Sequence, residues 1–380
     1  MSTLETTGTA LAGTSLFTPI TVGLNQLANR VVLAPLTRMR SSEGGVPNDL
    51  MAEYYSQRAT PGALLIAEAT LVSPNGHAYA GAPGILNEEQ LEGWKKVVNA
   101  VHDKGAIIFL QLFHGGRQSH QDLQPDGGVP IGPSAIPHNN LVCTEDGWVP
   151  ATQNREATIE EIHSIVDDFH AAANRAKQAG FDGIELHGAN GYLIDQFLQD
   201  GSNQRTDEYG GSIENRVRLL TQVVSRMVDV YGADSVGVRL GPSGRWGEMS
   251  DSNPLELFTY AVEQLDKFGL AYLHLIEPRV FGNVDRDDLV EPVAAVQLRK
   301  VFHGPIIAAG GFNGQGAADI IGRGDADLVA FGRYYVANPD LVRRLREGLP
   351  LNPYDRSSFF GGTEVGCTDY PFYSNNAELV

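Results

Sequence analysis

Eight short apolar runs alternate along the chain with stretches of helical periodicity, and this alternation restricts the possible folds more than any other feature. The runs that predict strands are residues 30–36, 63–69, 106–113, 183–187, 235–240, 271–276, 305–309 and 326–331. The stretches that predict helices are residues 48–59, 88–103, 158–179, 213–231, 254–268, 290–302, 315–322 and 339–348. Apolar strands that alternate with helices are typical of a parallel sheet covered by helices. Eight such units favour a closed (β/α)₈ barrel, or TIM barrel, over the alternative of an open, doubly wound sheet.

The connection after the third predicted strand departs from this pattern. Residues 114–157 contain many Gly, Pro and Asn and show no clear periodicity. Loops of this length inside a compact domain usually form a lid or a small subdomain, and this one leaves the strand end where a barrel keeps its active site. We expect one barrel domain over residues 16–380, preceded by a flexible tail at residues 1–15. An irregular, aromatic segment at residues 352–380 is expected to lie near the active-site face.

Composition disfavours several classes of partner and cofactor. The chain has 28 Lys and Arg against 46 Asp and Glu, and its net charge of −18 repels nucleic acid and anionic membranes. There is no run of 18 apolar residues, and the first 29 residues hold no Lys or Arg that could begin a signal peptide, so we expect a cytoplasmic protein. Two cysteines, Cys143 and Cys367, are too few for an iron–sulfur cluster, which needs about four thiolates.

Hydrogen-bonding groups gather at the ends of the predicted strands, which share one rim in a barrel. The strand-end sequences are Pro35-Leu36-Thr37, Glu68-Ala69-Thr70, Gln111-Leu112-Phe113-His114, His187-Gly188-Ala189-Asn190, Arg239-Leu240-Gly241-Pro242, the run from His274 to Glu277, Gly310-Gly311-Phe312 and Gly332-Arg333. Loops after the last two strands of a barrel often bind phosphate through backbone N–H groups, and Arg333 would add a charge-assisted contact. Gly311 and Gly332 taken alone could equally be turn residues.

His187 and Asn190 are close enough at one strand end to donate two hydrogen bonds to a single oxygen, and Tyr192 follows two residues later. A lone histidine in a barrel strand is more often a satisfied buried group, but the amide and the phenol favour a site. A barrel used only for binding should lack this complete donor set. A metal-dependent hydrolase is a further alternative, because His114, His187 and His274 lie near strand ends. Such sites usually need a tighter His and Asp cluster, so we expect no metal.

Six motifs are jointly specific for one known family. They are Leu33-Ala34-Pro35-Leu36-Thr37-Arg38, Glu53-Tyr54-Tyr55 with Gln57-Arg58, Gln111-Leu112-Phe113-His114-Gly115-Gly116-Arg117, His187-Gly188-Ala189-Asn190-Gly191-Tyr192-Leu193, Arg205-Thr206-Asp207-Glu208-Tyr209-Gly210-Gly211-Ser212 and Phe331-Gly332-Arg333. With these motifs the chain resembles the Old Yellow Enzyme family of FMN-dependent ene-reductases, from about Leu16 to Tyr373. The resemblance implies a barrel that binds FMN and takes electrons from NADPH or NADH, with NADPH the favoured donor.

The resemblance also implies a set of cofactor contacts. Thr37 would hydrogen-bond flavin O4, and a threonine rather than a cysteine there is similar to the classical branch of the family. Gln111 would pair with the pyrimidine edge, since an amide offers both a donor and an acceptor. Arg239 would lie near flavin N1 and O2, where a fixed cation stabilises the reduced anion. The remaining contacts would come from Pro35, Leu36, Ala69, His187, Gly310, Gly311, Gly332 and Arg333.

In the reaction that the resemblance implies, His187 and Asn190 bind the oxygen of an α,β-unsaturated carbonyl or nitro compound. This makes the β-carbon electrophilic toward hydride from flavin N5, and Tyr192 then protonates the α-carbon from the opposite face. No Gly-x-Gly-x-x-Gly fingerprint follows a strand, so the nicotinamide is expected over the same flavin face as the enone or quinone acceptor. The physiological acceptor remains open, as does the choice between monomer and homodimer.

Four further residues align with positions that line the substrate cavity in the family: Tyr79, Phe113, Trp246 and Cys367. Phe113 stands where a tryptophan is most common, and Cys367 replaces a tyrosine. Both replacements are smaller, although the bulky Trp246 refills some of the space, so we expect a cavity of altered shape. Cys367 could equally be an inert buried thiol.

Overall fold

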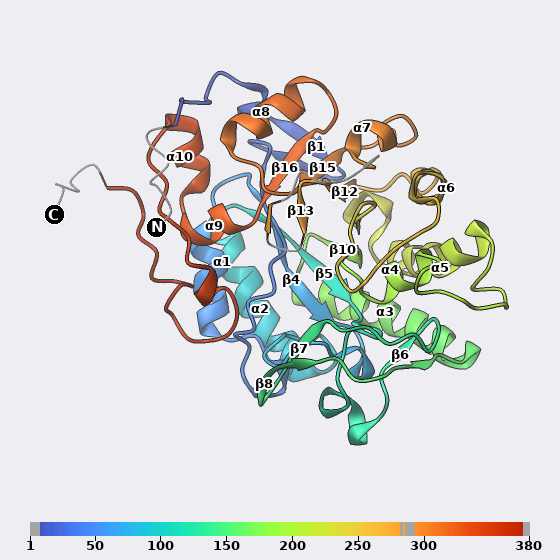
Figure 1. Cartoon of the computed structure of the whole chain (residues 1–380). Helices are drawn as coiled ribbons and strands as arrows, with labels where there is room; N and C mark the ends of the chain where they lie inside the picture. The colour runs from blue at the N-terminus through green and yellow to red at the C-terminus, as the bar shows by residue number, and fades with distance from the viewer. Residues whose placement is uncertain (1–7, 282–283, 286–292, 375–380) are drawn as a thin grey trace.

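Eight parallel strands close into a barrel, which confirms the predicted fold class (Figure 1). The structure is a computed structural model and describes residues 8–281, 284–285 and 293–374. The barrel strands are β3 (Val31–Leu33), β4 (Leu64–Leu71), β5 (Ile107–Phe113), β10 (Gly183–Gly188), β11 (Val236–Leu240), β12 (Tyr272–Ile276), β15 (Ile306–Ala309) and β16 (Leu328–Phe331). They follow one another around the barrel in chain order, and β16 pairs with β3 to complete the ring.

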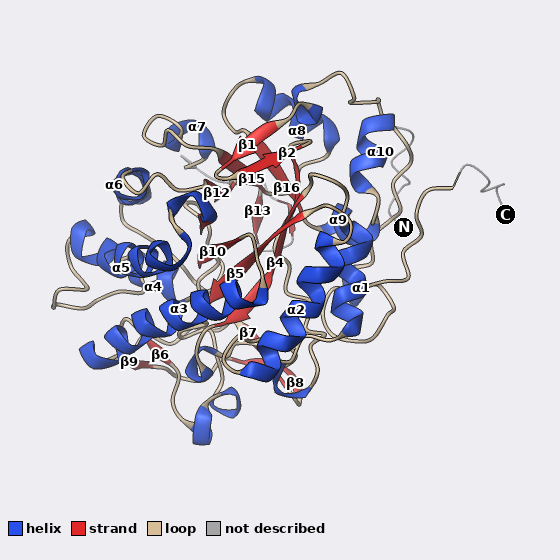
Figure 2. Ribbon diagram, turned by 180° about the vertical axis from the view of Figure 1, so that it is seen from behind, coloured by secondary structure: helices blue, strands red, loops and turns tan. Residues whose placement is uncertain are grey.

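Helices surround the strands, as Figure 2 shows. They are α1 (Asp49–Arg58), α2 (Glu88–His102), α3 (Ile159–Ala179), α5 (Ile213–Tyr231), α6 (Pro254–Asp266), α7 (Ala295–Leu298), α8 (Gly314–Gly322) and α10 (Leu341–Glu347), with two short unpredicted helices, α4 (Leu193–Leu198) and α9 (Arg333–Ala337). The helix predicted over residues 290–302 is much shorter than expected, and residues 290–292 lie outside the described part of the chain. Its first turn starts where the Glu277 carboxylate accepts the Ala295 N–H at 2.7 Å.

Side chains alternate along each barrel strand between the helices and the barrel interior. On β10, Ile184 and Leu186 pack outward into the main hydrophobic core. Glu185 and His187 occupy the intervening positions and are also buried. Both faces are therefore covered, which is why the strand reads as a nearly continuous buried segment with polar residues at inward positions.

The amino end of the barrel is closed by a hairpin that the sequence did not predict. Its strands are β1 (Ile20–Val22) and β2 (Asn25–Leu27). Val22 and Leu27 pack with interior barrel residues in one buried cluster. Residues 1–7 of the predicted tail lie outside the described residues, whereas Leu11 is buried and donates its N–H to the Leu345 carbonyl at 3.1 Å. The part of the tail around Leu11 therefore packs on α10.

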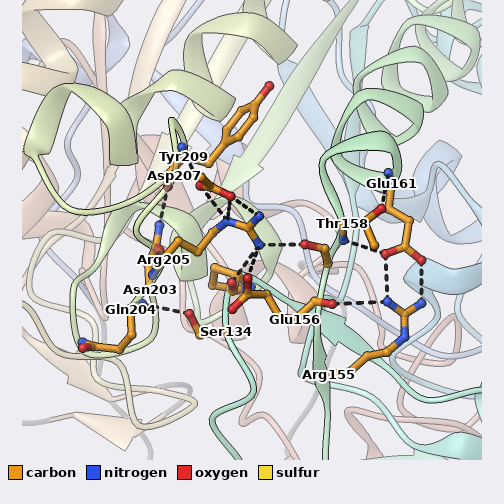
Figure 3. Close-up of polar contacts among 12 residues, drawn as sticks. Ser134, Arg155, Glu156, Thr158, Glu161, Asn203, Gln204, Arg205, Asp207 and Tyr209 are labelled. Carbon is orange, nitrogen blue, oxygen red and sulfur yellow. Dashed lines mark hydrogen bonds and ion pairs between the residues drawn. The ribbon is translucent and has the colours of Figure 1, made fainter.

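The excursion after β5 is tied to the barrel by a buried arginine. It contains the short strands β6 (Ile131–Gly132), β7 (Leu141–Thr144), β8 (Gly147–Pro150) and β9 (Arg155–Glu156). Arg205 donates to the carbonyls of Pro133 and Ala157 at 3.0 and 2.7 Å, and it forms an ion pair with Asp207 (Figure 3). A buried guanidinium with several charge-assisted partners holds a segment firmly, so this motif fixes the base of the excursion.

Three buried arginines hold the C-terminal segment against the barrel. Arg38, Arg40 and Arg58 are almost fully buried and donate to backbone carbonyls of that segment. The contacts are Arg38 Nη2 to Gly366 O at 2.8 Å, Arg40 Nε to Thr363 O at 2.9 Å and Arg58 Nη2 to Cys367 O at 3.0 Å. Residues 375–380 lie outside the described part. The segment has little regular structure because its carbonyls are satisfied by side chains instead of a sheet or helix.

No helix in the described part of the chain has both the length and the apolar character needed to cross a membrane.

Replacement of Arg58 tests this anchoring. Arg58 donates to the carbonyls of Tyr54, Tyr335, Val336 and Cys367. Since Arg58→Ala removes the guanidinium that these buried carbonyls contact, we expect it to lower the free energy of unfolding by about 3 kcal/mol, measured by urea denaturation. Arg323→Ala, which removes only an exposed ion pair with Asp325, should cost less than about 0.5 kcal/mol. Equal small losses would contradict the anchoring role.

Candidate active site

A cavity of about 540 Å³ opens at the carboxyl ends of the barrel strands. Its size suits a small-molecule ligand or cofactor. The excursion after β5, which we call the lid, contributes Asn139, Asn140, Leu141 and Trp148 to the cavity wall. The C-terminal segment contributes Phe359 and Phe360. The predicted site residues that line it are Pro35, Leu36, Thr37, Tyr79, Gln111, His187, Asn190, Tyr192, Arg239, Trp246, Gly310, Gly311, Gly332 and Arg333.

Three predicted site residues do not line this cavity. Ala69 and Phe113 are buried behind its wall, where Phe113 packs edge-on against Tyr192 with ring centroids 5.2 Å apart. Cys367 is also buried, because Arg58 holds its carbonyl and turns this part of the chain into the core. Burial raises the pKa of its thiol, so the alternative of an inert buried cysteine describes it better than a role in substrate binding.

The floor of the cavity rests on a polar layer inside the barrel. Gln111 Nε2 donates to Glu185 Oε1 at 2.7 Å, and His274 Nδ1 lies 2.8 Å from Glu185 Oε2. In the strand register, Arg239 is paired with His187 on one side and His274 on the other. Burial pushes the pKa of Glu185 up, but His274, Arg239 and Gln111 outweigh burial and lower it overall. Glu185 is therefore an ionised carboxylate with both oxygens engaged.

His187 is held as a neutral imidazole with its proton on the nitrogen that is free to face a ligand. Burial lowers its pKa well below the usual value, and the positive charge of Arg239 lowers it further. The Ala189 N–H donates to His187 Nδ1 at 3.3 Å, which makes Nδ1 the acceptor and leaves the proton on Nε2. His187 can therefore donate a hydrogen bond over the ordinary pH range without changing its charge.

The loop that carries Asn190 and Tyr192 is fixed by two side chains from α4. Asn190 and Gly191 both adopt left-handed backbone, with φ of 57° and 73°. Asp195 Oδ2 accepts the Gly191 N–H at 2.9 Å, and Gln196 Nε2 donates to the Gly191 carbonyl at 2.7 Å. Burial raises the pKa of Asp195 to about 7. Sequence reasoning missed both residues, although their position one helical turn after the loop could have indicated them.

Tyr192 places a protonated hydroxyl on the cavity wall. Its oxygen lies 3.0 Å from the hydroxyl oxygen of Tyr79. Burial raises the pKa of Tyr192 well above its usual value, and the nearby Tyr79 raises it further. The phenol ring packs edge-on against His187 with centroids 4.8 Å apart. The site therefore combines two hydrogen-bond donors and one phenolic proton source around a single cavity.

The cavity also fits the flavin that the sequence predicts. Arg239 is buried, lines the cavity, and its Nε has no hydrogen-bond partner among the described residues, so its charge is available to an electron-rich ring edge. Gly310 and Gly311 line the cavity and have φ of 129° and 64°, a backbone that glycine adopts without strain. Arg333 follows at the next strand end and suits a phosphate. No group of three metal-ligating side chains occurs in the described ranges.

Comparisons with known proteins agree with this geometry. Residues 15–352 match the model of the NADH:flavin oxidoreductase / NADH oxidase family. The chain is 47% identical to 12-oxophytodienoate reductase 1 of Oryza sativa subsp. japonica, over 96% of this chain and 94% of that protein. It is 43% identical to the flavin oxidoreductase hxnT of Emericella nidulans, over 94% of this chain and 97% of that protein. Morphinone reductase in complex with tetrahydroNAD superposes with a TM-score of 0.89 at 44% identity, covering 96% of this chain and 99% of that one.

Removal of the Asp195 carboxylate should loosen the loop that holds Asn190 and Tyr192. In Asp195→Ala the buried Gly191 N–H loses its acceptor, so its hydrogen exchange should become faster by a factor on the order of ten, measured by mass spectrometry or NMR. Asp182→Ala is the control, since Asp182 likewise accepts a backbone N–H, that of Ile108, but does not line the cavity. An unchanged Gly191 exchange rate in Asp195→Ala would show that the loop is held by other contacts.

Proposed function

This chain belongs to the NADH:flavin oxidoreductase / NADH oxidase family and is an FMN-dependent ene-reductase, and we propose which of its residues bind and reduce the activated alkene. The observation that carries the proposal is that His187, Asn190 and Tyr192 line one cavity together with Arg239. When bound, FMN supplies the hydride, from its N5 atom, that adds to the β-carbon of the acceptor.

The protein holds the cofactor through the strand ends of its barrel in this proposal. Arg239 supports the edge of the ring where negative charge collects on reduction, because its guanidinium faces the cavity and is held in place by the strand. Gln111 keeps its carbonyl oxygen available to the ring, since its Nε2 already donates to Glu185. Thr37, which also lines the cavity, would hydrogen-bond flavin O4. Pro35, Leu36 and the two glycine-containing strand ends complete the contacts, with Arg333 on the phosphate.

His187 and Asn190 activate the acceptor by binding its carbonyl or nitro oxygen. Two neutral donors in a buried site stabilise the negative charge that develops on this oxygen as the β-carbon accepts a hydride. His187 can do so at any ordinary pH, because its pKa is far below the usual value and Nε2 carries the proton. Asn190 reaches the same oxygen because its left-handed backbone is fixed by the contacts of Gly191.

Tyr192 completes the reduction by giving its phenolic proton to the α-carbon. The C=C π bond is thereby replaced by one C–H bond at each carbon, formed from the hydride and the proton. A pKa far above neutral keeps the phenol protonated until the electrons arrive on the acceptor. Tyr79 lies within hydrogen-bond distance and can stabilise the resulting phenolate until solvent returns the proton.

Several finer assignments belong to the same proposal. The acceptors are α,β-unsaturated carbonyl or nitro compounds and quinones, with NADPH favoured over NADH as electron donor. The relatives whose names state a substrate act on oxophytodienoate or morphinone, and both fit this class of activated alkene. The protein works in the cytoplasm as a monomer or homodimer. A steady-state screen of enones, nitroalkenes and quinones with both nicotinamides tests these points.

Tyr192→Phe separates proton donation from cofactor reduction. Loss of the hydroxyl should slow reoxidation of the reduced enzyme by 2-cyclohexenone by a factor on the order of 10²–10⁴. Reduction of the enzyme by NADPH should be almost unchanged, and both steps can be followed by stopped-flow absorbance. Tyr209→Phe, a buried tyrosine outside the cavity, serves as the control. Equal slowing of both half-reactions would remove the proposed role of Tyr192.

The combined replacement His187→Ala and Asn190→Ala tests the oxygen-binding pair directly. Phenols whose oxygen is bound over a flavin give a long-wavelength absorbance band, and the double variant should lose this band while retaining FMN. His187→Asn keeps a hydrogen-bond donor at position 187 and should preserve part of the long-wavelength band. A band that persists at full intensity in the double variant would place the acceptor oxygen elsewhere.

A further inference from the structure

A row of aromatic rings runs from His187 and Tyr192 to the mouth of the cavity. The ring of His187 lies 4.8 Å from that of Tyr192, and Tyr192 lies 6.3 Å from Tyr79, between centroids. Tyr79 is followed by Trp148 at 6.0 Å and Trp148 by Phe360 at 5.5 Å. Each ring is tilted or edge-on to the next. Tyr79, Trp148 and Phe360 all line the cavity, and we refer to these three rings as the mouth wall.

The outer two rings of the mouth wall come from segments that are far apart in the sequence. Trp148 lies on β8 of the lid, and Phe360 belongs to the C-terminal segment that the buried arginines hold in place. Lid and C-terminal segment therefore meet at a direct aromatic contact above the cavity. Each segment is anchored to the barrel separately, the base of the lid by Arg205 and the C-terminal segment by Arg38 and Arg40.

Exposure rises sharply along this wall. Tyr79 is 6% exposed, whereas Trp148 is 46% and Phe360 is 42% exposed, and the neighbouring Leu141 is 48% exposed. All of these outer side chains line the cavity. Apolar surface that stays uncovered at the rim of a ligand cavity is a usual mark of a binding site, since covering it is favourable. Trp148 and Phe360 thus stay almost half exposed although they contact each other, and both belong to the cavity lining.

We propose that Trp148 and Phe360, with Leu141, form a second subsite that binds an apolar ring carried by the acceptor on the side away from its activating oxygen. This inference rests on the proposed ene-reductase function and narrows its substrate class to enones with an aryl, terpenoid or fused-ring substituent. The row of rings sets the direction in which a bound acceptor extends. When His187 and Asn190 hold its oxygen, the rest of the molecule extends along Tyr79 toward the cavity mouth. Aromatic rings favour edge-on and offset contacts with such groups.

The chemistry of the mouth wall favours the acceptor over the dinucleotide donor as its occupant. A nicotinamide dinucleotide carries phosphates, which are recognised by cations or by several N–H donors. The mouth wall consists of three rings, the adjoining Leu141 is aliphatic, and none of these four residues is cationic. The exposed cation among the cavity residues, Arg245, belongs to the loop after β11 instead. The apolar part of an acceptor therefore matches the wall better than the donor does.

The experiment compares two enones that differ by one ring. Steady-state kcat/KM with NADPH is measured on the FMN-loaded full chain for 2-cyclohexenone and 4-phenyl-2-cyclohexenone. In Trp148→Ala and Phe360→Ala, kcat/KM for the phenyl compound relative to the parent enone should fall about tenfold, the scale expected when a bound apolar group loses its pocket. Trp148→Phe and Phe360→Leu keep apolar volume and should retain most of the ratio. Phe372→Ala is the control, because Phe372 is 53% exposed but does not line the cavity.

Each other outcome has a definite meaning. A ratio that changes no more than in Phe372→Ala would overturn the subsite, and so would an equal loss for both enones. A raised KM for NADPH with an unchanged ratio would assign the wall to the donor and overturn the proposal. Turnover of 2-cyclohexenone by the unmodified protein keeps the ene-reductase function separate from these results. An unmodified protein that reduces neither enone would contradict that function and the subsite together.

Discussion

The site depends most on the contacts that the buried Glu185 carboxylate makes with Gln111 and His274. An ionised group inside a barrel is tolerated only when it is fully paired, and here one oxygen accepts from Gln111 and the other contacts His274. The two partners belong to β5 and β12, so the carboxylate of β10 links three strands directly below the cavity. This link fixes the amide of Gln111 and keeps Arg239 in an electrostatically balanced layer. The floor is thus preorganised before a ligand arrives.

The sequence predicted the barrel well because its strands are buried on both faces. All eight predicted strands and most predicted helices are present within a few residues, and α3 begins at a capping box formed by Thr158 and Glu161. The position of the proposed site residues was also predictable, since residues at strand ends meet at one rim whatever the details of packing. His187, Asn190 and Arg239 stand at predicted strand ends and all line the cavity, whereas the role predicted for Arg239 came from the family resemblance.

The remaining features depend on contacts between distant segments, which a sequence pattern does not reveal. Cys367 was expected in the cavity, but the hydrogen bond from Arg58 to its carbonyl turns it into the core. Phe113 stands at the end of β5, as predicted, but it packs against Tyr192 and does not line the cavity. The hairpin β1–β2 has strands of three residues, too short for periodicity to be seen. The polar lid shows no periodic pattern, although Trp148 and three other lid residues line the cavity.

Gly191, in the loop after β10, packs directly against the backbone of the loop after β11. A Cβ atom at position 191 would lie 2.6 Å from the carbonyl oxygen of Trp246, and Arg117 donates to the Gly247 carbonyl at 2.8 Å. A side chain at position 191 would therefore displace the loop after β11, so this part of the cavity wall tolerates little change by mutation. Diversification of such a chain toward new compounds would begin in the lid and the C-terminal segment, which can change by mutation while the hydride and proton chemistry stays intact.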